Sequence, residues 1–158
     1  MLIIALTWEE YMERPTLKIK IRLLDPAAKA PHKSHAGDAG WDLFASEYAE
    51  VNPGETRIIK TGMALEIPTG WYGQIKSRSG LGAKGLIVTA GVIDCTYRGE
   101  VGVVVVNGNK PGGQAFAFHP GDKIAQMIFL PVPDVTIEMT ENLNGSSRGS
   151  NGFGSTGQ

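Results

Sequence analysis

The stretch "LKIKIRLL", residues 17–24, is typical of a β-strand that turns one face toward a protein core. Its apolar residues recur at every second position, and basic residues stand between them. Because successive side chains of a strand point to opposite faces, this alternation predicts a half-buried strand. The apolar face would hold Leu17, Ile19, Ile21 and Leu23.

Similar short segments follow along the rest of the chain, separated by turn signals rich in glycine and proline such as "NPGE", "PTG", "NGNKPGG" and "HPGD". One stretch, "WEEYMER" (8–14), could form two turns of helix. Many short strands at regular spacing predict an all-β sandwich or barrel in a single domain. The further candidate strands are "WDLFA" (41–45), "TRIIKTGMALEI" (56–67), "WYGQIK" (71–76), "GLIVT" (85–89), "EVGVVVVN" (100–107), "QAFAF" (114–118), "KIAQMIFLPV" (123–132) and "VTIEM" (135–139).

The composition limits the classes of partner. The chain has 158 residues, 42% of them hydrophobic, and a net charge of −1, so no overall positive charge attracts nucleic acid or an anionic membrane. The single cysteine, Cys95, indicates a reducing compartment. The apolar start "MLIIALT" is too short for a signal peptide or a membrane span. We therefore expect a soluble, cytoplasmic protein that binds neither nucleic acid nor membranes.

Two candidate strands suggest an assembly. The run "VVVV" (103–106) is apolar on both faces, and "MIFLPV" (127–132) nearly so. Strands of this kind are normally covered on both sides, and the chain has no helices to supply a second cover. This favours an oligomer, with a small closed barrel or a tightly packed sandwich as the alternative.

Four segments carry polar residues beyond the needs of a plain β-domain, and each residue taken alone also has an ordinary structural interpretation. Asp42 and Asp94 could cap turns, Arg78 could be a solvated surface charge, Tyr97 could belong to the core, and Gln126 could satisfy a backbone group. The segments are "AGDAGWDLFAS" (36–46), "SRSGLGAKG" (77–85, with a possible short helical turn), "AGVIDCTYRGEVGVVVVN" (90–107) and "HPGDKIAQMI" (119–128).

The last thirteen residues, "SSRGSNGFGSTGQ" (146–158), have the composition of a flexible end, yet they include one arginine, Arg148, and one aromatic residue, Phe153. A segment that orders only around its ligand would look like this, with the charge and the ring as its two contacts.

Taken together and in order, "AGWDL", "RSGLG", "GVIDCTYRGE", "GDKIAQMI" and "RGSNGFGSTG" resemble the five motifs of the trimeric dUTP diphosphatase (dUTPase) family. Five ordered motifs are a far more specific signal than any one of them. The resemblance covers residues 17–157. It implies a jelly-roll-like β domain over residues 17–143, preceded by an N-terminal extension (1–16) and followed by a flexible, substrate-covering C-terminal arm (144–158).

The resemblance also implies a role for each matching residue. Asp94 would orient and deprotonate the attacking water, and Tyr97 would lie under the deoxyribose and leave no room for a ribose 2′-hydroxyl. Asp42 would support the water shell of a Mg²⁺ ion held mainly by the substrate phosphates. Further contacts are implied for Arg78, Ser79, Gly80 and Gln126 at the phosphates, for Gly91, Val92, Ile93 and Gly102 at uracil, and for Arg148, Phe153, Gly154, Ser155 and Thr156 in the C-terminal arm.

The implied activity is hydrolysis of dUTP to dUMP and pyrophosphate by in-line attack of water on the α-phosphate. Such a reaction limits uracil in DNA and supplies dUMP for thymidylate synthesis. The implied assembly is a homotrimer with shared active sites. Two alternatives share the fold: a dCTP deaminase, whose catalytic glutamate would fall near Val104, and a nucleotide-sensing or protein-binding module.

Overall fold

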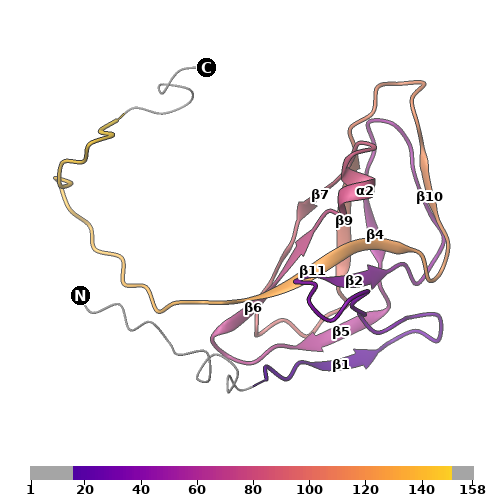
Figure 1. Ribbon diagram of the computed structural model, residues 1–158, viewed down its shortest axis with the longest axis horizontal. Helices are drawn as coiled ribbons and strands as arrows, with labels where there is room; N and C mark the ends of the chain where they lie inside the picture. Colours follow the sequence, from indigo (N-terminus) through magenta and orange to yellow (C-terminus); the bar gives the residue numbers. More distant parts are fainter. Residues whose placement is uncertain (1–15, 151–158) are drawn as a thin grey trace.

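The computed structural model describes residues 16–150, and in this range the chain is almost entirely β (Figure 1). Eleven strands form antiparallel pairs, and a single helical turn, α2 (Ser79–Gly82), lies in the segment where the sequence indicated one. No helix in this range is long and apolar enough to cross a membrane. The strands are β1 (Lys20–Leu23), β2 (Trp41–Phe44), β3 (Ala49–Val51), β4 (Thr56–Lys60), β5 (Met63–Glu66), β6 (Trp71–Lys76), β7 (Leu86–Ala90), β8 (Val92–Ile93), β9 (Gly102–Asn107), β10 (Phe116–Phe118) and β11 (Lys123–Pro131).

The strands are arranged in two larger sheets and two pairs. One sheet has the order β2-β11-β6-β8 and the other β4-β9-β7, while β1 pairs with β5 and β10 with β3. Neighbours in the sheets are mostly far apart in sequence, as in a jelly-roll-like sandwich. The predicted all-β, jelly-roll-like fold is confirmed.

The core lies between the sheets and collects every second residue of their strands. In β9, Val103 and Val105 are completely buried, whereas Val104 and Val106 point to the opposite face and are only half-buried. The run at 103–106 is therefore apolar on both faces, as predicted, but a single chain covers only one of them. The other large buried side chains include Leu43, Ile59, Met63, Ile75, Leu86, Ile124 and Met127.

The prediction for residues 17–24 holds only in part. The strand is formed at Lys20–Leu23, and Leu17 and Ile19 are half-buried, but Ile21 and Leu23 remain 40% and 49% exposed. In the described chain β1 pairs with β5 alone, outside the two larger sheets, so it is less enclosed than their strands.

The predicted strand at 135–139 is not formed. After β11 the chain runs away from the body of the molecule (Figure 1), so no neighbouring strand pairs with it. Its alternating residues Val135, Ile137 and Met139 are 73%, 85% and 92% exposed. Strand propensity alone does not make a strand, because the backbone needs a partner for its hydrogen bonds. The possible helix at 8–14 lies outside the described residues.

The long run at 56–67 is broken into β4 and β5 at Gly62. This glycine has φ of +64°, and a Cβ atom there would lie 2.7 Å from Cβ of Ala28 and 2.9 Å from Cβ of Ser46. Both the backbone conformation and the space therefore require glycine.

We expect Gly62→Ala to destabilise the fold by about 2–6 kcal/mol, since left-handed backbone strain and overpacking of rigid neighbours each cost about 1–3 kcal/mol. The matched control is Gly54→Ala, where φ is +80° but a Cβ would meet nothing within 4 Å. Thermal or urea unfolding at one protein concentration should rank wild type, Gly54→Ala and Gly62→Ala in falling stability. Equal losses in the two variants would mean that crowding at Gly62 is unimportant.

Candidate active site

The register of the four-stranded sheet brings three of the sequence motifs together. In the central strand β11, Gln126 is aligned with Asp42 of β2 on one side and with Lys76 of β6 on the other. Arg78 follows Lys76 by two residues, directly after β6 ends. Residues more than thirty positions apart thus converge at one end of the sheet.

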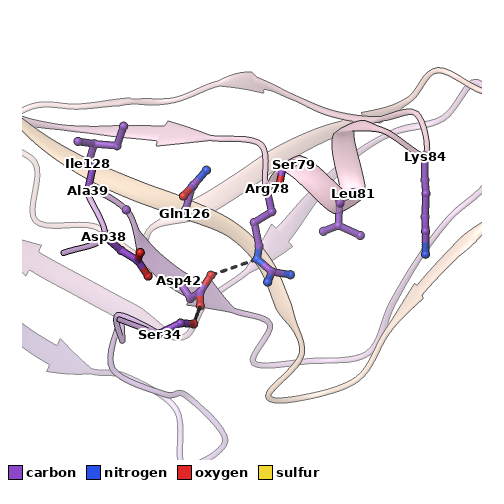
Figure 2. A pocket seen from close by; sticks show the side chains of 12 residues that line it. Ser34, Asp38, Ala39, Asp42, Arg78, Ser79, Leu81, Lys84, Gln126 and Ile128 are labelled. Carbon is purple, nitrogen blue, oxygen red and sulfur yellow. Dashed lines mark hydrogen bonds and ion pairs between the residues drawn. The ribbon is translucent and has the colours of Figure 1, made fainter. Parts of the chain in front are cut away.

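A cavity of about 650 Å³ opens at this point. Figure 2 shows the Arg78 guanidinium turned toward Asp42, with Asp38 to one side and Lys84 at the opposite rim. All the phosphate-binding residues that the sequence indicated in the β domain line this cavity, and Asp42 lines it too. The lining residues that carry polar or charged side chains are Ser34, Asp38, Asp42, Arg78, Ser79, Lys84 and Gln126.

Asp42 is the centre of a charge network. Its Oδ1 accepts a hydrogen bond from Arg78 Nε at 3.1 Å, and its Oδ2 lies 2.6 Å from Lys123 Nζ. The same Oδ2 accepts from Ser34 Oγ at 3.2 Å, and Lys123 Nζ donates to Ser34 Oγ at 3.0 Å. Asp42 therefore fixes the position of the Arg78 side chain.

The network also keeps Asp42 ionised. Burial alone would raise the pKa of this carboxyl group, but the hydrogen bond from Lys123 and the charges of Arg78 and Lys123 outweigh burial and lower the pKa below its ordinary value. The resulting ion pairs are present at neutral pH and are lost only as the pH falls through this lowered pKa.

The loop that carries Arg78 is held from both sides. Gln126 Nε2 donates to the carbonyl of Ser77 at 3.0 Å, and Ser77 Oγ accepts from Val88 N at 2.9 Å. Arg78 and Lys84 then present positive charge to a cavity that also contains the polar groups of Ser79 and Gln126. Such a cavity suits an anion with several oxygens.

Asp94 and Tyr97 lie in a second region, on the turn between β8 and β9. β8 pairs with β6 in the register Gly73 with Ile93 and Gln74 with Val92, and Ile75 N donates to the carbonyl of Gly91 at 2.7 Å.

The turn itself is closed by a hydrogen bond from Tyr97 N to the Asp94 carbonyl at 3.1 Å. Arg98 Nη1 donates to the carbonyls of Cys95 at 2.6 Å and Tyr97 at 2.9 Å. Gly102 begins β9 after this turn, so the residues indicated for uracil lie on both sides of it.

Within residues 16–150 of one chain, the two regions border different cavities. Neither Asp94 nor Tyr97 lines the cavity around Arg78. Asp94 instead borders a separate hollow of about 360 Å³, together with residues such as Trp71 and Asp134. Arg148 is exposed on the segment beyond β11, which runs away from the body of the molecule (Figure 1). Phe153, Gly154, Ser155 and Thr156 lie outside the described residues.

Sequence reasoning gave no role to four polar residues in or beside the first cavity, and one of them, Asp38, lines it. Lys123 and Ser34 complete the network around Asp42, and Lys84 stands at the rim. Lys123 and Lys84 belong to segments that had been singled out, so a search for cations near Asp42 and Arg78 could have found them. Ser34 gave no signal, because a loop outside the motifs supplies it.

Comparison with known proteins places the chain in a family. A dUTPase family profile matches residues 27–157. A deoxyuridine 5′-triphosphate nucleotidohydrolase of Trichodesmium erythraeum is 44% identical, over 89% of this chain and 99% of the relative. One of Clostridium tetani is 43% identical, over 89% of this chain and 97% of the relative.

Solved structures agree with the sequence relatives. A mutant dUTPase of Staphylococcus bacteriophage 80alpha with dUpNHpp superposes with a TM-score of 0.83 and 29% identity, over 90% of this chain and all of that one. A mutant dUTPase of phage phi11 of S. aureus, described with a structural Mg(II) ion, gives a TM-score of 0.73 and 29% identity, over 79% of this chain and 97% of that one. With these motifs in place around the Arg78 cavity and on the β8–β9 turn, the chain belongs to the dUTPase family.

Proposed function

We propose that the protein hydrolyses dUTP to dUMP and pyrophosphate by in-line attack of water on the α-phosphate, at sites shared between the subunits of a homotrimer. The reaction itself follows from membership of the dUTPase family, whose relatives cover nearly all of this chain. The observation that carries the assignment of the site is the cavity around Arg78, in which the Asp42 network holds a guanidinium ready for an anion.

The substrate phosphates would bind in this cavity. Arg78, Ser79, Gly80 and Gln126 line it, as expected for a phosphate subsite. A guanidinium can bind phosphate oxygens through two parallel hydrogen bonds, and Asp42 engages it through Nε. Fixing these groups before the substrate arrives lowers the barrier to reaction through positioning and electrostatic stabilisation.

Mg²⁺ would be held mainly by the substrate. The described residues contain no cluster of three or more His, Cys, Asp or Glu side chains suited to a metal ion, which fits an ion that is bound largely through phosphates and water. Asp42 already accepts hydrogen bonds from Arg78, Lys123 and Ser34, and a carboxylate offers about four acceptor positions. One position is thus left for a metal-bound water. When bound, Mg²⁺ would neutralise negative charge on the phosphates.

Asp94 would act as the general base. It stands exposed on the β8–β9 turn, where its carboxylate can reach a water molecule held against a bound nucleotide. Tyr97 lies three residues further on the same turn and would contact the deoxyribose. The backbone of Gly91–Ile93 and of Gly102 would recognise uracil.

Shared sites in a homotrimer are supported by the separation of Asp94 from the Arg78 cavity in one chain. They are also supported by the outer face of the sheet β4-β9-β7. There Ile58 is aligned with Val104, and Ile87 with Val106, which makes a continuous apolar surface. Ile58 is 62% exposed and Ile87 49%, so this surface is suited to burial against another subunit.

The domain organisation that we propose is a β domain over residues 17–143, an N-terminal extension (1–16) and a C-terminal arm (144–158) that closes over the bound nucleotide. Arg148 would contact the terminal phosphate and Phe153 would cover uracil, while Gly154, Ser155 and Thr156 would donate to phosphate. A cytoplasmic location is supported by the single cysteine.

Of the two alternatives, neither gains support. The relatives named above are nucleotidohydrolases, and a deaminase would need a carboxylate near Val104, where valine cannot take part in proton transfer. Release of pyrophosphate from dUTP, without ammonia from dCTP, is the expected outcome of an assay with Mg²⁺ and both nucleotides.

We expect Asp94→Asn to lower kcat by about 10²–10⁴-fold while dUTP still binds, because the amide keeps the size of the side chain but cannot accept the proton. The control is Asp134→Asn, which removes the same charge from the same hollow. Steady-state kinetics and calorimetric binding of dUTP separate the two effects. Wild-type kcat in Asp94→Asn would exclude Asp94 as the base.

Removal of residues 146–158 should abolish most activity and leave the unliganded Tm almost unchanged. The described part of the removed segment, 146–150, is exposed and contributes no residue to the core. Loss of a charge-assisted contact at Arg148 costs roughly 1.5–3 kcal/mol, and loss of a stacked ring roughly 1–3 kcal/mol. Unfolding or aggregation of the truncated protein would show that the segment is structural.

Mixed assemblies of these two inactive variants test the shared site. If Asp94 and the C-terminal arm of one site come from different chains, random co-refolding of Asp94→Asn with the truncated chain restores both parts in about a quarter of the sites. We therefore expect activity to return in the mixture. Mixtures shown by mass to contain both chains, yet as inactive as the parents, would mean that both parts come from one chain.

A further inference from the structure

The Tyr97 ring is held in one orientation by its own turn. Its hydroxyl donates to the carbonyl of Glu100 at 2.8 Å, so the ring folds back along the turn instead of projecting into solvent. Glu100 is itself fixed, because its Oε1 accepts from Gly62 N at 2.9 Å. The side chain of Tyr97 is nevertheless 45% exposed, so one side of it is open to a ligand.

The ring can take this position only because residue 99 has no side chain. A Cβ atom on Gly99 would lie 2.6 Å from Cζ and 2.9 Å from Cε2 of Tyr97, and closer still to the hydroxyl oxygen. Carbon atoms in favourable contact are about 3.5–4.0 Å apart. The backbone does not demand glycine here, since Gly99 is not among the residues with positive φ.

We propose that Gly99 is a specificity-determining positioning residue: by leaving room for the Tyr97 ring to fold back toward the Glu100 carbonyl, it sets the distance between that ring and the sugar of the nucleotide. The inference rests on the proposed role of Tyr97 beneath the deoxyribose. A ring held this way forms a rigid floor that a 2′-hydroxyl would meet. A methyl group at residue 99 would push the ring away from this position, and the site would then distinguish dUTP from UTP less well.

The atoms that would clash are at the free end of an exposed side chain and not in the core. The ring can therefore swing away from an added methyl group without unfolding the turn, which Arg98 and the hydrogen bond from Tyr97 N keep closed. We therefore expect an alanine at residue 99 to lower the selectivity for dUTP over UTP and to leave the stability of the fold unchanged. If the role of Gly99 were purely structural, the variant would instead lose stability and keep its selectivity.

The experiment compares kcat/KM for dUTP and for UTP in the full-length protein and in Gly99→Ala. We expect the dUTP-over-UTP ratio to fall by about 2- to 10-fold, the range that corresponds to forcing a side chain off its preferred rotamer. Tm should stay close to that of the wild type. The matched control is Gly37→Ala, where an added Cβ meets nothing within 4 Å, and its ratio should not change.

Three further variants make each outcome decisive. Tyr97→Ala should lower the ratio, and adding Gly99→Ala to it should have no further effect, because the ring is already gone. Tyr97→Phe, which loses only the bond to Glu100, should lower the ratio less.

The results that would overturn the proposal about Gly99 differ from those that would overturn the proposed role of Tyr97. If Tyr97→Ala lowers the ratio and Gly99→Ala does not, the inference about Gly99 is wrong while the proposed role of Tyr97 stands. If Tyr97→Ala leaves the ratio unchanged, both are wrong. An additional loss in the double variant, or a large fall in Tm for Gly99→Ala, would show that Gly99 acts by another route.

Discussion

The pairing of β11 with both β2 and β6 is the constraint on which the site depends. It places Gln126 beside Asp42 on one edge and beside the end of β6 on the other, so that the loop bearing Arg78 starts next to the carboxylate that holds it. Backbone hydrogen bonds set this arrangement. The contacts between polar side chains then stabilise this arrangement but are not needed to create it. Strand pairing alone brings residues from the three distant motifs close together.

The proposed site has two parts: a closely hydrogen-bonded part around Asp42 and a separate, exposed part around Asp94. Around Asp42, ion pairs and hydrogen bonds leave the charged groups few alternatives. Asp94, by contrast, stands on an exposed turn that borders a different hollow. In the proposed mechanism, this arrangement would separate the binding of phosphate from the activation of water, and it would make the reaction depend on association of subunits.

The sequence was sufficient for the architecture, and it indicated residues that the structure brings together around Arg78. Turn signals and period-two runs predicted most of the strands, though not the short β3 and β8, and the motif residues indicated for phosphate do converge on one cavity. Prediction from sequence failed where the outcome depends on a neighbouring segment. The stretch "VTIEM" alternates like a strand, but no neighbouring strand pairs with it. Ile21 and Leu23 alternate like residues of a buried face, but they lie exposed. Prediction from sequence also missed Ser34, because the loop that supplies it is placed by tertiary structure and carries no local pattern.

The charge balance around Arg78 has a consequence for turnover. Arg78, Lys84 and Lys123 bring three positive charges to the cavity and its network, and Asp38 and Asp42 bring two negative ones, so the excess is a single positive charge. A strongly positive cavity would attract a triphosphate more firmly, but it would also retain the pyrophosphate released from it. With two of its three cations balanced, the cavity would hold the phosphates of the proposed substrate largely through shape and directed hydrogen bonds. In the proposed reaction, pyrophosphate is no longer tied to the nucleoside once the bond is cut, and an excess of a single positive charge would offer little electrostatic resistance to its release.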